Sequence, residues 1–174
     1  EYETNKYYNV RYSGSLPIER IVGVGKFTLP LTAFDPDAYS IVENNEITWG
    51  SEVINFTHDY LLGTTGGKTH TITRLQTITE TVNGNLAVRP TFIINGSATN
   101  VTFSANGKSF SLPSFTNAEW IIDGETWSAE KDGQNALGDM TGDFIELVQG
   151  DNDIEITGSG LNFTLDVRFR DRFS

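Results

Sequence analysis

The chain has 174 residues with no cysteine, and its formal net charge is −11 at pH 7. This length can bury one large core or two small ones. The absence of cysteine excludes a disulfide framework and a thiolate metal site. The acidic charge argues against a nucleic-acid partner, because phosphates are neutralised by a surplus of Lys and Arg. The sequence contains neither an apolar run of about 18 residues, which a membrane-spanning helix needs, nor the pattern of a signal peptide.

Strand patterns and turn formers alternate in the first part of the chain. Residues 7–12 are aromatic and β-prone, and residues 13–17 predict a turn. Residues 19–34 have the pattern of one longer strand. The alternation of apolar and polar positions shifts near Gly23 and Gly25, where we expect a β-bulge.

Pro36 is expected to end this strand, because proline cannot donate a hydrogen bond to a β-ladder. We therefore place a domain boundary at about residues 36–45, just past this break. The predicted units are residues 1–40 and residues 41–174.

From residue 45 onward, short β-prone runs are separated by turn formers. Asn95-Gly96, Asn106-Gly107 and Asp123-Gly124 predict turns, because tight hairpins need the positive φ that Asn, Asp and Gly tolerate. Residues 161–169 alternate apolar and polar side chains, as a half-buried strand does. The one helical candidate is a single turn within residues 135–140. We predict an all-β fold, an antiparallel β-sandwich or jelly roll.

The residues that could carry catalysis do not have the spacing expected of an active site. Four carboxylates surround the Asp123-Gly124 turn: Glu119, Asp123, Glu125 and Glu130. They could supply the carboxylate pair of a β-sandwich glycosidase, but we interpret them as turn formers and solvated strand ends. The only histidines, His58 and His70, have no spacing that predicts a metal site. We therefore predict a protein that is not an enzyme and holds no cofactor or metal.

Four aromatic residues could stack on sugar rings: Trp49, Tyr60, Trp120 and Trp127. We expect Trp120 and Trp127 on the two strands of one hairpin, where they could face each other. The alternative, which we favour, is that the tryptophans fill the core of the sandwich. A carbohydrate-binding module therefore stays an alternative function, with these four residues as its candidate site.

Several spaced motifs resemble the distal tail proteins of long-tailed siphophages. They are the Asp-Pro-aromatic strand end at residues 34–39, the run 90–96 after Asn83-Gly84-Asn85, residues 121–123 followed by 133–136, the turn at 144–152, and the basic and aromatic tail at 168–173. Together these motifs cover most of residues 20–173.

The resemblance implies a virion structural protein. In this family the N-terminal domain forms a hexameric ring at the tip of the tail tube, and a galectin-like β-sandwich projects outward from it. Residues 1–40 would then be the end of the ring domain and residues 41–174 the galectin-like sandwich. Because the family's ring domain is longer than the segment before Pro36, we expect the chain to be truncated.

The function implied by the resemblance is that of a tail-tip or baseplate hub subunit. Its expected partners are other phage tail proteins (tail tube, tail tip and receptor-binding protein), with a homo-hexameric ring in the full-length protein. The expected location is the virion, after synthesis in the host cytoplasm. A host cell-surface glycan is the alternative partner, and neither nucleic acid nor a membrane span is expected.

Overall fold

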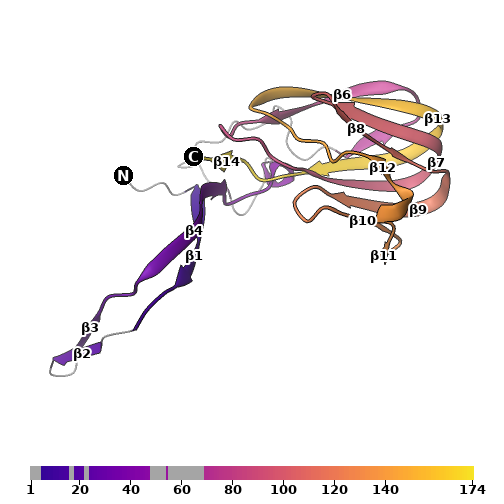
Figure 1. Ribbon diagram of the computed structural model, residues 1–174. Helices are drawn as coiled ribbons and strands as arrows, with labels where there is room; N and C mark the ends of the chain where they lie inside the picture. The colour runs from indigo at the N-terminus through magenta and orange to yellow at the C-terminus, as the bar shows by residue number, and fades with distance from the viewer. Residues whose placement is uncertain (1–4, 16–17, 22–23, 48–53, 55–68) are drawn as a thin grey trace.

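The computed structural model describes residues 5–15, 18–21, 24–47, 54 and 69–174. It shows one β-sandwich with a long hairpin attached at one end (Figure 1). The predicted all-β fold is confirmed, since the strands pair antiparallel throughout the described residues.

The sandwich contains the strands β5 (His70–Ile72), β6 (Gln76–Val82), β7 (Thr91–Ala105), β8 (Lys108–Leu112), β9 (Phe115–Asp123), β10 (Ser128–Lys131), β11 (Gln134–Asn135), β12 (Thr141–Gly142) and β13 (Gly150–Arg168). The hairpin contains β1 (Lys6–Tyr12), β2 (Ile18–Ile21), β3 (Val24–Phe27) and β4 (Leu31–Ser40), and β14 (Arg172–Phe173) joins it. Two short 3-10 turns are η1 (Asn44–Glu46) and η2 (Leu137–Asp139).

Two long strands, β7 and β13, organise the sandwich because each takes part in both layers. The first half of β7 pairs with β9 and the second half with β8. The first half of β13 pairs with β6, and β5 pairs further along the same strand. β7 and β13 also pair with each other. The register of this pairing shifts near the middle of each strand, and the pairing continues on both sides of the shift. Long strands that bend at bulges in this way form the corners where two sheets meet.

Glycines sit where the two long strands approach each other at these bends. Gly96 and Gly158 have φ of +142° and +143°, and a Cβ atom on either would overlap the backbone of the facing strand. Only glycine adopts this backbone conformation without strain. The prediction of a turn at Asn95-Gly96 is therefore wrong: this pair lies inside β7, at the bulge.

Two other predicted turns are found, whereas the turn predicted at residues 13–17 lies partly outside the described residues. Asn106-Gly107 joins β7 to β8, with Ala105 opposite Lys108. The chain turns between β9 and β10 directly after Asp123, which is opposite Ser128. The helical turn expected within residues 135–140 is η2.

The predicted N-terminal strand pattern is wrong in two respects. Residues 19–34 do not form one strand, because β2 pairs antiparallel with β3, with Ile21 opposite Val24. Pro36 does not end a strand either, since β4 continues to Ser40. Residues 34–37 have no partner in β1, so the missing N–H of proline removes no ladder hydrogen bond there.

The core lies between the two layers and is rich in aromatic rings. Phe92 and Phe103 of β7 pack with Phe110 of β8, with ring centroids 5.2 Å and 4.9 Å from that of Phe110. Trp120 is fully buried and packs edge-on against Phe115. Aromatic pairs in these geometries add to the free energy that area burial supplies.

A buried asparagine fastens the turn before β13. Asn152 is 1% exposed. Its Oδ1 accepts hydrogen bonds from the backbone N–H of Val148 (2.8 Å) and from Asn106 Nδ2 (2.7 Å). Its own Nδ2 donates to the carbonyls of Val148 (2.7 Å) and Gly150 (2.8 Å). One side chain thus joins the β13 turn to the β7–β8 hairpin.

We expect Asn152→Ala to lower the free energy of unfolding by about 2–4 kcal/mol, because it removes the hydrogen bonds of one buried side chain to the backbone of Val148 and Gly150 and to Asn106. Urea unfolding followed by circular dichroism measures the loss. Asn162→Ala, at an exposed position of the same strand, is the control and should change stability by less than about 0.5 kcal/mol. Equal losses in the two variants would contradict the role of Asn152.

Candidate functional site

The hairpin of β1, β2, β3 and β4, here called the arm, extends away from one end of the sandwich (Figure 1). Of the eleven large hydrophobic side chains that are exposed among the described residues, seven lie on the arm. They are Tyr7, Tyr8, Val10, Tyr12, Leu29, Leu31 and Phe34.

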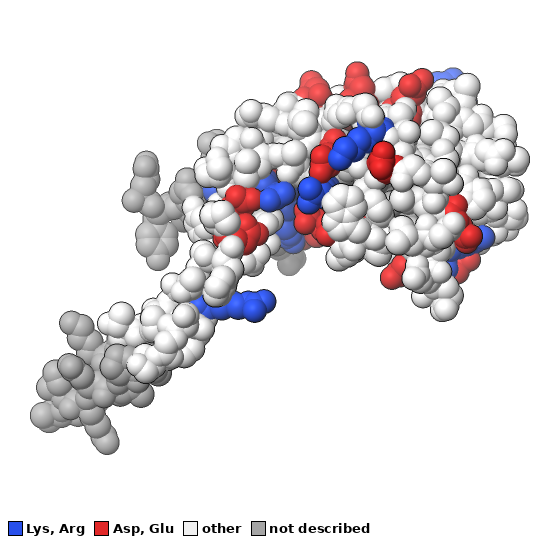
Figure 2. Space-filling view, viewed as in Figure 1, with Lys and Arg blue, Asp and Glu red and all other residues white. Residues whose placement is uncertain are grey.

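These side chains occupy both faces of the ribbon. Val10 is opposite Ala33 and Tyr12 is opposite Leu31, so these four share one face. Phe34 follows Ala33 along the strand, points to the other face, and is 74% exposed. Figure 2 shows few charged side chains on the described part of the arm. Exposed apolar side chains that gather in this way mark an interaction surface.

The C-terminal segment, residues 169–173, holds the arm on the sandwich. β14 pairs with β4, with Arg172 opposite Tyr39. One residue earlier, the backbone N–H of Ser40 donates to the carbonyl of Asp171 (2.9 Å), and the N–H of Asp171 donates to Ser40 Oγ (3.2 Å). The end of the chain therefore serves as the third strand of the arm sheet.

The carboxylate of Asp171 connects this segment to the sandwich. The residue is 5% exposed. Its Oδ1 accepts hydrogen bonds from the backbone N–H groups of Asn83 (2.9 Å) and Gly84 (3.2 Å), which follow β6. A Cβ on Gly84 would overlap the backbone of Arg172, so only glycine allows this contact. We call the Asp171 contacts with Ser40, Asn83 and Gly84 the latch.

Asn44 of η1 reinforces the latch from the other side. Its Nδ2 donates to the carbonyl of Val167 (2.8 Å), and its Oδ1 accepts from the N–H of Phe169 (3.0 Å). The segment between the arm and the sandwich is thus bonded to the end of β13 at Val167 and to the start of the C-terminal segment at Phe169.

A tyrosine and an aspartate of β4 form a second polar contact in the arm. Tyr39 Oη donates to Asp35 Oδ2 (2.5 Å), and the N–H of Asp37 donates to Asp35 Oδ1 (3.1 Å). Burial, and then this hydrogen bond, raises the pKa of Tyr39 to about 12. The hydrogen bond from Tyr39, and then that from Asp37, lowers the pKa of Asp35.

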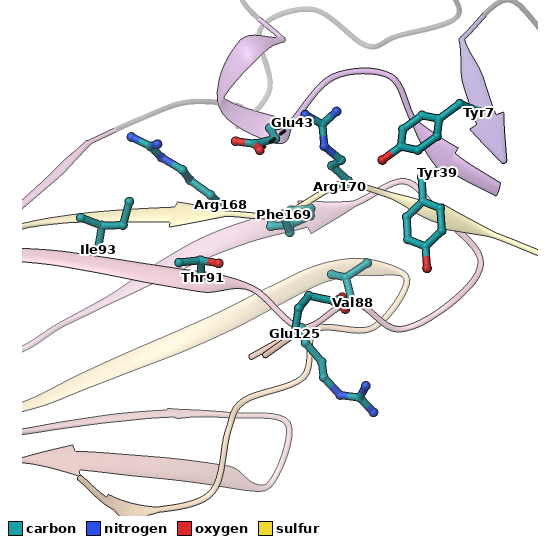
Figure 3. Close-up of a pocket in the computed structure, with 11 residues that line it drawn as sticks. Tyr7, Tyr39, Glu43, Val88, Thr91, Ile93, Glu125, Arg168, Phe169 and Arg170 are labelled. Carbon is teal, nitrogen blue, oxygen red and sulfur yellow. Dashed lines mark hydrogen bonds and ion pairs between the residues drawn. The ribbon is translucent and has the colours of Figure 1, made fainter. Parts of the chain in front are cut away.

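A cavity of about 400 Å³ opens at the joint between arm and sandwich (Figure 3). Its charged lining residues are three arginines and two glutamates: Arg89, Arg168, Arg170, Glu43 and Glu125. Tyr7 and Tyr39 close one end, with their rings stacked 5.7 Å apart.

Each arginine of the cavity has an ionic partner. Arg168 Nη2 lies 2.7 Å from Asp166 Oδ2, and Arg170 Nη2 lies 3.5 Å from Glu43 Oε1. Arg89 Nε lies 2.9 Å from Glu146. Lys108 reaches the other oxygen of Glu146 at 2.8 Å. The hydrogen bond from Lys108, followed by that from Arg89, outweighs burial and lowers the pKa of Glu146.

The predicted sugar-stacking residues do not come together among the described residues. Trp120 is 0% exposed and so offers no ring face to a ligand, in line with the core alternative. Its partner across the hairpin is Lys131 rather than Trp127. Trp127 lies in the turn with φ of +56° and is 49% exposed, edge-on to Phe144, so the expectation that the tryptophans fill the core is wrong for this residue. Trp49 and Tyr60 lie outside the described residues.

Of the carboxylates near this turn, Asp123 has a structural position and Glu125 lines the cavity. Asp123 Oδ1 accepts from the N–H groups of Glu125 (2.9 Å) and Thr126 (3.3 Å), as a turn former does. Within the described ranges, no three His, Asp or Glu side chains gather as metal ligands would. None of the helices found there is long and apolar enough to cross a membrane.

Sequence reasoning did not find the arm surface or the cavity. The signal for the arm is the pair Tyr7-Tyr8 and the run Leu29 to Phe34, where apolar side chains fall on both faces of a strand. A strand that packs against a core on one face only would alternate apolar and polar side chains instead. The cavity has no sequence signal, since its lining comes from segments far apart in the chain.

The fold as a whole, sandwich and arm together, is similar to that of a known phage protein. It is similar to the crystal structure of the SPP1 Dit (gp 19.1) protein, described as a paradigm of the hub adsorption apparatus in Gram-positive infecting phages. The TM-score is 0.64 at 17% sequence identity, over 99% of this chain. The chain spans 62% of the length of that protein. No family model matches the sequence, and no curated protein matches it significantly.

The raised pKa of Tyr39 gives a test of the joint. One of the six tyrosines should titrate near pH 12, and Tyr39→Phe should remove that step. Because the folded state favours the neutral phenol, the stabilisation from Tyr39 is complete below pH 10 and lost as the pH rises towards about 12. The ultraviolet absorbance of phenolate measures the titration. Tyr12→Phe should leave the step in place; its loss in that variant would contradict the assignment.

Proposed function

We propose that this chain is a non-enzymatic structural subunit of a phage tail tip, of the distal tail hub type. The arm is its docking surface for neighbouring tail proteins, and the sandwich projects from the assembly. The similarity to the fold of Dit, which extends over the arm as well as the sandwich, supports this proposal. Function does not follow from fold alone, so the arm surface carries the proposal.

The exposed ribbon of the arm is the observation that favours assembly. A two-stranded ribbon buries little surface and is marginally stable in water by itself. Apolar side chains on both of its faces gain stability when another protein covers them. The polar groups along the edges of such a ribbon can also pair with a further strand.

The distribution of charge favours contacts between copies through the arm. Residues 1–40 carry four Lys or Arg and five Asp or Glu, so their net charge is −1. Residues 41–174 carry eight and eighteen, which gives a net charge of −10. Two such sandwiches repel each other at close range, whereas two arms do not.

The proposed role also includes a ring of copies, a role for each of the two units, and a location in the virion. In the full-length protein the copies close into a ring of six, with residues 1–40 as the end of the ring domain. Residues 41–174 are the galectin-like domain that faces baseplate or receptor-binding proteins. The protein is made in the host cytoplasm and acts in the virion. We do not assign glycan binding to the Trp120 and Trp127 pair, because Trp120 is buried.

Light scattering with size-exclusion chromatography tests the docking role of the arm. The weight-average mass of this chain should rise above 19.2 kDa with increasing concentration. The double variant Leu31→Ser/Phe34→Ser should weaken this association about tenfold or more, since two exposed apolar anchors are lost. Leu75→Ser, at a residue 60% exposed on the sandwich, is the matched control and should associate as the wild type does.

A mass of one subunit at every concentration would contradict self-association through the arm. Equal association of the double variant and the wild type would place the contact elsewhere. Both variants are on exposed positions, so circular dichroism should show unchanged folding in each.

A further inference from the structure

The cavity at the joint is bounded by three separate parts of the molecule. The arm contributes Tyr7 and Tyr39, and the sandwich contributes Thr91 and Arg168, which are opposite each other on β7 and β13. Arg170 belongs to the C-terminal segment that holds the arm. Figure 3 shows Glu43 and Arg170 on one side of the cavity and Thr91 with Ile93 on the other. A ligand here would contact the arm and the sandwich at once.

The size and lining of the cavity suit a small ligand. Its volume of about 400 Å³ falls within the range of about 300–1,000 Å³ that is usual for small-molecule sites. Apolar contact comes from Val88, Ile93 and Phe169, beside the charged and hydroxyl groups. Such a mixture of apolar surface with a few polar groups is typical of sites that fix the orientation of a ligand.

The charges of the cavity are balanced. Arg168 is paired with Asp166, Arg170 with Glu43, and Arg89 with Glu146. Lys108 is also paired with Glu146. The remaining carboxylate, Glu125, interacts electrostatically with Arg172, which is itself paired with Asp37. Each of the three arginines that line the cavity is therefore neutralised by a carboxylate. The cavity offers hydrogen-bond donors and acceptors in comparable number, but no net charge that would select an anion or a cation.

An aromatic platform stands at the arm end of the cavity. The ring of Tyr7 stacks on Tyr39 with an interplanar angle of 27°, which occupies one face of each ring. Tyr7 is still 38% exposed. An amphipathic ring of this kind gives apolar contact to the C–H face of a sugar while the polar groups around it bond to the hydroxyls.

We propose that the cavity binds a neutral saccharide of one or two rings. Tyr7 stacks on the ring, and the guanidinium of Arg168 and the carboxylate of Glu43 bond to its hydroxyls. Since the ligand bridges the arm and the sandwich, binding stiffens the joint. This inference does not depend on the assembly proposed for the arm.

Two other sites fit a saccharide less well. The Trp120 and Trp127 pair is excluded by the burial of Trp120. A second, more open cavity lies beside the β7–β8 turn, but its lining of Thr, Ser, Asn, Lys and acidic side chains includes no aromatic ring. An anionic ligand is disfavoured at the joint by the balanced local charge and by the net charge of −11.

Saturation-transfer difference NMR tests the site with glucose, galactose, N-acetylglucosamine and rhamnose at millimolar concentration. Glucuronate and glycerol phosphate serve as anionic probes. We expect at least one neutral sugar to bind, and Arg168→Gln and Tyr7→Leu each to weaken it about tenfold, as the loss of charge-assisted bonds or of a stacking ring does. The matched controls Arg74→Gln and Tyr12→Leu, at exposed positions outside the cavity lining, should bind as the wild type does.

A second readout follows the joint itself. A bound sugar should slow hydrogen exchange at Ser40 and Asp171, whose backbone groups pair the arm to the C-terminal segment. The proposal is overturned if none of the four sugars binds, if the anions bind more tightly, or if both cavity variants bind as the wild type does. Because self-association is measured without sugar, its failure and the failure of this site are separate results.

Discussion

The position of the arm depends on one buried carboxylate. Asp171 accepts hydrogen bonds from two backbone N–H groups after β6, while its own backbone bonds to Ser40 at the end of β4. Three segments that are far apart in the sequence meet at this residue. Hydrogen bonds to a charged group contribute about 1.5–3 kcal/mol each, and leaving such a group buried without them costs more. The latch therefore fixes the direction in which the apolar ribbon leaves the sandwich, and with it the shape of the cavity between them.

Much of the sandwich could be predicted from local sequence, because its turns depend on a few neighbouring residues. Asn106-Gly107 forms its hairpin with Gly107 at φ of +77°, as the pair requires. Asn95-Gly96 has the same local pattern but lies inside a strand, since the facing strand β13 comes close to Gly96. That approach is a long-range contact, which no window of sequence shows. Likewise, the four residues between Asp123 and Ser128 move Trp127 out of the strand and away from Trp120.

The candidate sites were harder to predict for the same reason. The aromatic residues of β1 were identified as a strand, but whether that strand lies against a core depends on the fold of the whole chain. In the cavity, Tyr7 and Arg168 come from opposite ends of the sequence. Under the proposed function these two features belong together: the ribbon docks neighbouring subunits, and the cavity at its base is where a ligand can act on its orientation. Both features require that the latch holds the arm in one direction.

Because the sequence contains no cysteine, two spin labels can be placed without background, at Thr32 on the arm and at Thr116 on the sandwich, both exposed. Pulsed electron spin resonance then measures the distance between the labels. We expect one narrow distance distribution in the otherwise wild-type chain and a broad one in Asp171→Ala, with the circular dichroism of the sandwich unchanged. A broad distribution in both proteins, or the same narrow one in both, would contradict the claim that the latch sets the arm.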